Sequence, residues 1–194
     1  MILFVGLGNP EPSYKDTRHN LGFKAIDLLS TKTKIGLKKE NNCLIGFGKI
    51  DGIDVALAKP LCFMNESGGP IFSIYKKLNP DAMIVIHDDM DITPGRIKIK
   101  KEGQSAGHRG VLSIIHSFGR DDFLRIRIGI GKPTGNGRDY VLSPPHKEEE
   151  KMLEDACNMA ADACFMIAKN GIKKAMNEYN RKSRVKDQGL GVKE

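Results

Sequence analysis

An apolar run at residues 1–5, Met-Ile-Leu-Phe-Val, constrains the fold more than any other stretch. It is followed at once by Gly6-Leu7-Gly8-Asn9-Pro10, and a helical pattern begins near Asn20. A strand without alternating polar residues is typical of the centre of a sheet that is covered on both faces. We therefore expect Asn9 at the carboxyl end of a central strand and His19 near the start of the next helix. Open α/β sheets bind their ligands at that edge.

Strand and helix patterns alternate along the rest of the chain. Two strands at residues 43–50 and 53–59 flank Asp51-Gly52, a strong hairpin signal. Further strands are expected at 83–86, 96–101 and 124–130, and helices at 20–29, 70–78, 108–116, 146–170 and 172–179. The pattern predicts the α/β class, a single-domain mixed β-sheet sandwiched between α-helices, over residues 1–180. Residues 181–194 are expected to form a basic, mobile tail.

Charge and cysteine content narrow the class of protein. The 194 residues include 31 Lys and Arg against 24 Asp and Glu, a formal net charge of +7, which favours a polyanionic partner. We find no apolar run of membrane-spanning length and no secretory signal, and therefore expect a cytoplasmic protein with no membrane partner. The cysteines lack metal-type spacing and are expected to be buried, reduced thiols: Cys43, Cys62, Cys157 and Cys164.

His19 is the strongest candidate for a general base, although a histidine at a helix start can simply cap or pack. Asp88 follows a second buried strand, so it is expected at the same sheet edge, where it could orient the imidazole. A metal site built on His19 is less favoured, because no second cluster of histidine and carboxylate completes the ligand shell. Motifs for a serine nucleophile, a Walker phosphate loop and a complete dinucleotide fingerprint are missing. Hydrolysis would therefore use an activated water or a substrate hydroxyl.

Two asparagines, Asn9 and Asn65, are expected in loops at strand ends. Their amides could donate to a carbonyl oxygen that becomes an oxyanion, but asparagine is also common in turns for conformational reasons. Met64, beside Asn65, has the character of a residue that fills a core or a crevice. His116 and His146 are expected to be surface or packing residues.

Five short motifs occur in one order, and together they resemble bacterial peptidyl-tRNA hydrolase over residues 1–179. The resemblance implies a phosphorylase/hydrolase-like domain, monomeric, with no metal, no cofactor and no stable protein partner. It implies a peptidyl-tRNA substrate, a peptide esterified to the terminal ribose of tRNA and released when a ribosome stalls. The motifs are Gly6-Leu7-Gly8-Asn9-Pro10, Tyr14-x-x-Thr17-Arg18-His19-Asn20-x-Gly22, Phe63-Met64-Asn65-x-Ser67-Gly68, His87-Asp88-Asp89-x-Asp91 and Arg125-x-Arg127-Ile128-Gly129-Ile130-Gly131.

The resemblance also implies a role for each matching side chain. His19 would be the catalytic base, oriented by Asp88, while Asn65 would help to place and stabilise the reacting carbonyl. Lys100 and Arg127 would bind the 5′-phosphate of the tRNA. The residues implied to contact the rest of the substrate are Asn9, Tyr14, Met64, Asn65 and His108. Arg109, which stands where the family usually has an asparagine, is also expected to contact the substrate.

One position departs from the family pattern. The family usually has Gly-His-Asn-Gly where this chain has Gly107-His108-Arg109-Gly110. Arginine cannot accept a hydrogen bond as the asparagine amide can, but it binds phosphate well. The departure leaves an alternative open, a non-catalytic RNA-binding protein of the same fold. The retained pair of His19 and Asp88 favours an esterase, because RNA binding alone needs neither residue.

Overall fold

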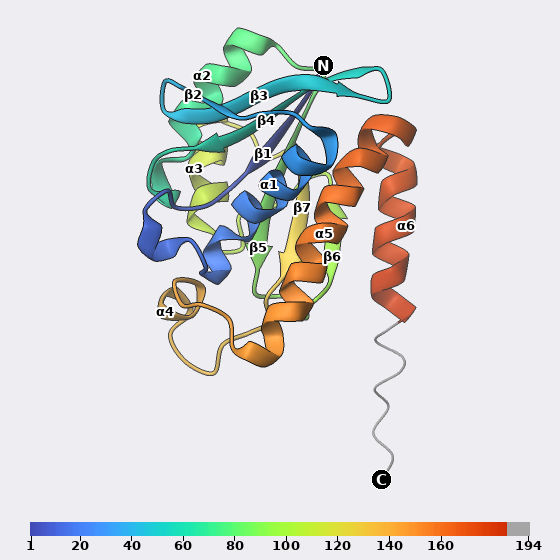
Figure 1. Cartoon of the computed structure of the whole chain (residues 1–194). Helices are drawn as coiled ribbons and strands as arrows, with labels where there is room; N and C mark the ends of the chain where they lie inside the picture. Colours follow the sequence, from blue (N-terminus) through green and yellow to red (C-terminus); the bar gives the residue numbers. More distant parts are fainter. Residues whose placement is uncertain (186–194) are drawn as a thin grey trace.

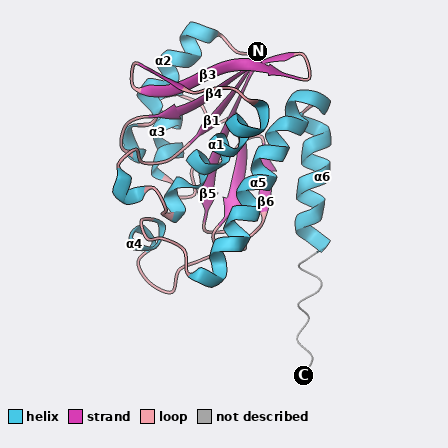
Figure 2. Cartoon of the chain, viewed as in Figure 1, coloured by secondary structure: helices cyan, strands magenta, loops and turns pink. Residues whose placement is uncertain are grey.

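The computed structural model describes residues 1–185, with side chains described to residue 181. A seven-stranded mixed sheet runs through the molecule in the order β2-β3-β4-β1-β5-β7-β6 (Figures 1 and 2). Strands β4, β1, β5 and β7 are parallel, while β2, β3 and β6 run antiparallel to their neighbours. The bounds are β1 Ile2–Gly6, β2 Lys38–Glu40, β3 Cys43–Ile50, β4 Ile53–Pro60, β5 Ala82–Asp89, β6 Ile97–Lys100 and β7 Leu124–Gly129.

Helices cover both faces of the sheet. Helices α1, α5 and α6 pack on one face, and α2 and α3 pack on the other (Figure 1). This arrangement confirms the expected α/β sandwich. The bounds are α1 Leu21–Thr33, α2 Gly68–Leu78, α3 Arg109–Phe118, α4 Gly137–Val141, α5 Lys147–Asn170 and α6 Ile172–Val185, with 3₁₀ turns η1 Pro12–Tyr14, η2 Arg18–Asn20 and η3 Met64–Glu66.

Strand β1 is the central strand that the first five residues predict. It pairs in parallel with β4 on one side and β5 on the other. Its side chains alternate between the two cores: Phe4 belongs to the α1/α5 side, and Leu3 and Val5 belong to the α2/α3 side. All three are fully buried, which explains why the strand contains no polar position.

The predicted hairpin is also confirmed. Strands β3 and β4 pair from Ile50 and Ile53 outward, and the two connecting residues, Asp51 and Gly52, have φ values of 49° and 82°. Positive φ at both central residues is the geometry that matches the twist of a two-residue hairpin. Cys43, Cys157 and Cys164 are buried free thiols as expected, whereas Cys62 is partly exposed.

Several local predictions are wrong. His87 to Asp89 continue β5 instead of leaving it, because they pair with Arg127 to Gly129 of β7. Strand β2 and helix α4 were not predicted. The apolar pattern of α5 predicts that Met152 belongs to its buried stripe, but Met152 is 43% exposed. Helix α6 continues to Val185, past the expected start of the basic tail. The rest of the expected tail, 186–194, lies outside the described residues. No helix of the described chain has the length and apolarity that a bilayer span requires.

The two edges of the sheet are protected in different ways. Strand β2, at one edge, consists of Lys38, Lys39 and Glu40, and charges disfavour pairing with another strand. At the other edge, the Asn180 amide of α6 pairs with the backbone of β6. Its Nδ2 donates to the Ile99 carbonyl at 2.9 Å, and its Oδ1 accepts from the Ile99 amide at 2.8 Å. One side chain thus satisfies both polar groups of an edge residue.

We expect Asn180→Ala to lower the free energy of unfolding by about 1–2 kcal/mol, because both backbone groups of Ile99 lose their partner. The measurement is urea denaturation. Asn177→Ala is the matched control, since Asn177 is exposed on the same helix and alanine there should stabilise the helix by a few tenths of a kcal/mol. Equal effects of the two substitutions would contradict a role for Asn180 at the edge.

Candidate active site

The polar residues of the site meet at the carboxyl ends of β1 and β5. Because these strands are parallel neighbours, Asn9 after β1 and Asp88 near the end of β5 reach the same edge of the sheet. His19 lies on turn η2, which leads directly into α1. The three residues line one cavity of about 320 Å³. Of the residues predicted from the sequence, the cavity brings together Asn9, Tyr14, His19, Met64, Asn65, Asp88, His108 and Arg109.

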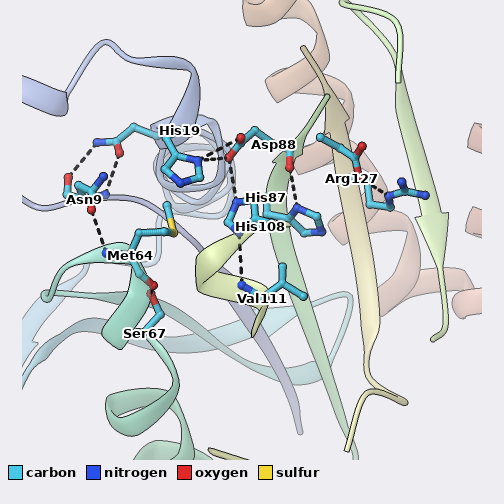
Figure 3. Close-up of polar contacts among 11 residues, drawn as sticks. Asn9, His19, Met64, Ser67, His87, Asp88, His108, Val111 and Arg127 are labelled. Atoms are coloured by element: carbon cyan, nitrogen blue, oxygen red, sulfur yellow. Dashed lines mark hydrogen bonds and ion pairs between the residues drawn. The ribbon is translucent and has the colours of Figure 1, made fainter. Parts of the chain in front are cut away.

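Asp88 is the hydrogen-bonding centre of the site (Figure 3). Its carboxylate accepts from His19 Nδ1 at 2.9 and 3.1 Å and from His108 Nε2 at 3.0 Å, and the residue is only 2% exposed. Since an ionised carboxylate only accepts, both ring nitrogens carry hydrogen. The proton on Nδ1 of neutral His19 leaves a lone pair on Nε2, and His19 lines the cavity. The geometry fits a base that is oriented by a carboxylate.

The charge state of Asp88 follows from two opposing effects. Burial raises the pKa of this carboxyl, but the charges and hydrogen bonds of His19 and His108 outweigh burial and hold the pKa below its ordinary value. Asp88 is therefore ionised at neutral pH. A negative charge at this position stabilises the imidazolium that forms when His19 takes up a proton.

His108 has a second function as the N-cap of α3. Its Nδ1 accepts from the Val111 backbone amide at 3.3 Å, which fixes the tautomer that donates from Nε2 to Asp88. Its ring also lies 4.7 Å from the rings of His19 and His87, measured between centroids. The resemblance implied only substrate contact for His108, so its hydrogen bond to Asp88 is a feature that the sequence analysis missed.

Asn9 is held from two sides. Its backbone amide and carbonyl bond with the side chain of Asn20, at 2.7 and 2.9 Å, and its Oδ1 accepts from the Met64 backbone amide at 2.9 Å. Among the described residues, Asn9 Nδ2 has no hydrogen-bond partner, so this donor is available to a ligand in the cavity. Asn65 follows Met64 on turn η3 and is exposed. Met64 both lines the cavity and packs in the core, as its two predicted roles require.

Arg18, which precedes His19, is a site residue that the sequence analysis missed. Its side chain is 1% exposed, donates to Ser143 Oγ at 2.9 Å and to the Pro144 carbonyl at 2.8 Å, and pairs with Glu149. Its guanidinium also lies over the Tyr140 ring at 4.2 Å. Arg18 thus ties turn η2 to the segment between α4 and α5. The signal for this role was its position in the Thr17-Arg18-His19-Asn20 run.

The predicted phosphate ligands do not line the cavity. Lys100 and Lys98 of β6 lie directly opposite Arg125 and Arg127 of β7, so the four side chains share one face of the sheet. The two lysines are exposed and Arg127 is 20% exposed, but Arg125 is buried against the Phe123 ring. The alternation of basic residues at 98 and 100 and at 125 and 127 predicts one basic surface from four side chains. The structure forms it from Lys98, Lys100 and Arg127, because Arg125 is buried.

A metal is the other chemical possibility at this site. In the described part of the chain, ligand atoms of His19, Asp88 and His108 lie within 4.8 Å of one another. However, the nearest nitrogens of both histidines already donate to Asp88. A cation bound by all three groups would displace both hydrogen bonds, so the arrangement fits an oriented base better than a metal centre.

Comparison with known proteins gives one family. A model of the peptidyl-tRNA hydrolase family matches residues 3–188. The chain is similar to peptidyl-tRNA hydrolases of Geobacillus thermodenitrificans, 45% identical over 187 residues, and Thermodesulfovibrio yellowstonii, 43% over 186, each match covering 93% of this chain and all of the relative. A peptidyl-tRNA hydrolase crystal structure from Acinetobacter baumannii superposes with a TM-score of 0.86 at 35% identity, covering 93% of this chain and 94% of that one.

A buried histidine beside the site, His87, should make the free energy of unfolding depend on pH in mild acid. His87 is buried beside His108, and burial and this neighbour lower the pKa of His87 well below 6.5. The unfolded chain binds a proton at this histidine below pH 6.5, whereas the folded chain does not. The free energy of unfolding should therefore fall as the pH drops below 6.5, by up to about 1.4 kcal/mol per pH unit from this group.

His87→Gln should remove the contribution of this histidine to the slope of the free energy of unfolding against pH. Urea denaturation at pH 7, 6 and 5 measures the slope. His116→Gln is the control, because His116 is exposed on α3 and should leave the slope unchanged. Asp88 acts in the same direction but in a separate window, below pH 4, because its lowered pKa starts from 3.8. An unchanged slope in His87→Gln would show that His87 is not held neutral.

Proposed function

The chain belongs to the peptidyl-tRNA hydrolase family, and we propose that it hydrolyses the ester bond between a peptide and the 3′-terminal ribose of tRNA. The observation that carries the proposal is the hydrogen bond from His19 to the buried carboxylate of Asp88, inside a cavity that two asparagines also line. Its biological role would be to recycle peptidyl-tRNA that is released from stalled ribosomes.

His19 starts the reaction as a general base. Its Nε2 takes a proton from a water, and the hydroxide that results attacks the ester carbonyl. In the alternative route, Nε2 takes the proton of the neighbouring ribose hydroxyl, and the ribose oxygen in turn removes a proton from the water that attacks the carbonyl. Asp88 stabilises the imidazolium. In the water route, the bond between the carbonyl carbon and the ribose oxygen then breaks, and His19 returns its proton to that oxygen. A covalent intermediate with the protein is not needed.

The two asparagines act on the peptide side of the ester. The free Nδ2 of Asn9 binds the peptide end, while the exposed amide of Asn65 donates to the carbonyl oxygen as negative charge develops there. Tyr14, Met64 and His108 complete the walls around them. These steps use only side chains of this chain and the reactants, with no cofactor.

The tRNA is bound by positive charge outside the cavity. Lys100 and Arg127 contact the 5′-phosphate, and exposed Arg109 at the cavity contacts a phosphate near the 3′ end. The protein acts in the cytoplasm as a monomer without a stable protein partner. The alternative of a non-catalytic RNA-binding protein gains no support, because the base and its carboxylate are joined by hydrogen bonds inside the cavity.

The first test of this function is His19→Ala. We expect kcat for an N-blocked aminoacyl-tRNA to fall by about 10²–10⁴-fold, the usual contribution of a general base, while tRNA affinity is unchanged. Release of the blocked amino acid measures the rate. His116→Ala, a change to an exposed histidine of α3, is the control and should retain full activity. If His19→Ala keeps more than about a tenth of wild-type kcat, the catalytic assignment is wrong.

The second test concerns Arg109. If it binds a phosphate, Arg109→Asn should reduce the slope of log KM against log salt by about one unit and leave kcat near the wild-type value. Lys173→Gln removes one exposed charge near the start of α6, away from the lining of the cavity, and should not change the slope. Identical kcat, KM and salt slope in Arg109→Asn would show that Arg109 contacts no phosphate.

A further inference from the structure

Two consecutive carboxylates end strand β5, and they bind different partners. Asp88 accepts from His19 and His108, whereas Asp89 Oδ2 accepts from Arg127 Nε at 2.6 Å. Successive side chains of a strand point in different directions, which explains why adjacent carboxylates bind different partners. Figure 3 shows Arg127 on the other side of β5 from His19.

Both oxygens of the Asp89 carboxylate accept hydrogen bonds, and the side chain is almost inaccessible to solvent. Its side chain is 5% exposed, and its Oδ1 accepts from the Asp91 backbone amide at 2.8 Å. The Asp89 backbone carbonyl also accepts from Ile130 at 3.0 Å. These bonds hold the carboxylate in one orientation, so it offers Arg127 a fixed acceptor.

The contact with Arg127 uses one edge of the guanidinium only. Nε donates to Asp89, while Nη1 and Nη2 have no hydrogen-bond partner among the described residues. A guanidinium that is held through Nε keeps its two terminal nitrogens available for a phosphate. Lys98 lies directly opposite Arg127 on β6 and adds a further positive charge beside it.

We propose that Asp89 is a positioning residue that aims the Nη groups of Arg127 at the 5′-phosphate of the tRNA. This inference rests on the proposed function. Because Asp88 and Asp89 are adjacent in one paired strand, β5 also fixes the spacing between the phosphate contact and the catalytic base. The pair therefore selects substrates whose 5′-phosphate and ester lie at the matching separation.

If Asp89 positions Arg127, we expect two effects on RNA binding that an ion pair with a purely structural role would not have. A carboxylate beside Arg127 reduces the positive charge of this surface and so weakens the general attraction to RNA. The same carboxylate improves the orientation of the Arg127 guanidinium toward the 5′-phosphate. Asp89→Asn should thus raise the affinity for RNA in general and lower the preference for a 5′-phosphate. The asparagine can still accept from the Asp91 amide, but its NH₂ group faces a donor at Arg127 Nε.

The experiment compares the Kd of deacylated tRNA with and without its 5′-phosphate, which requires no hydrolysis. We expect wild type to prefer the phosphorylated tRNA, and Asp89→Asn to reduce the ratio of the two Kd values by about tenfold or to unity, as for the loss of a charge-assisted contact. Asp122→Asn makes the same charge change in an exposed pair with Arg120 and should keep the wild-type ratio. Melting curves show that each variant is folded.

Two further variants show whether Asp89 acts through Arg127. In Arg127→Lys, which has no Nε donor in that position, adding Asp89→Asn should reduce the ratio no further. Asp89→Ser is used if Asp89→Asn does not fold, because its hydroxyl can cap the Asp91 amide without binding Arg127.

An unchanged Kd ratio in folded Asp89→Asn or Asp89→Ser would overturn the positioning role. A wild-type ratio of one would overturn it as well, together with the assignment of the phosphate ligands. Failure of the proposed function has a different signature: the wild-type protein would release no amino acid from blocked aminoacyl-tRNA, while the Kd ratios could still follow the pattern expected for Asp89.

Discussion

A buried carboxylate with two imidazole donors is the interaction on which the site depends. An ionised Asp88 in the interior would be costly without partners, and His19 and His108 remove that cost by hydrogen bonding to it. The three side chains come from η2, β5 and the start of α3, so they meet only when the sheet and both helix layers are complete. The geometry of the candidate site is therefore a product of the whole fold, and the central strands β1 and β5 fix its position.

The residues that flank His19 explain how one short turn holds this imidazole in place. Arg18 is anchored to the segment before α5, while Asn20 is bonded to the backbone of Asn9. Because both neighbours of His19 are anchored, His19 has little conformational freedom between them. Preorganisation of this kind lowers the cost of reaching the reactive arrangement. The same turn thus joins the cavity wall, the base and the α4–α5 connection.

Sequence reasoning succeeded where the signal is local. Strand β1, the hairpin at Asp51-Gly52 and the long helix α5 all have patterns that can be read within about twenty residues. The predictions were wrong where pairing with a strand far along the chain decides the local structure. His87 to Asp89 are polar and resemble a loop, yet pairing with β7 keeps them in the sheet. The functions of Arg18 and His108 also depend on partners far along the chain. The resemblance placed the candidate residues, but only the coordinates show which atoms of Asp88 and Asp89 each partner uses.

The pair of hydrogen bonds between the Asn180 side chain and the Ile99 backbone forms late during translation. Ile99 is translated 81 residues before Asn180, so the growing chain has an open β6 edge during that interval. An unpaired edge can add strands from other nascent chains. Once α6 forms, a single side chain takes up the hydrogen bonds that such a strand would use. Protection of the β6 edge therefore comes late in synthesis, only after translation has passed Asn180.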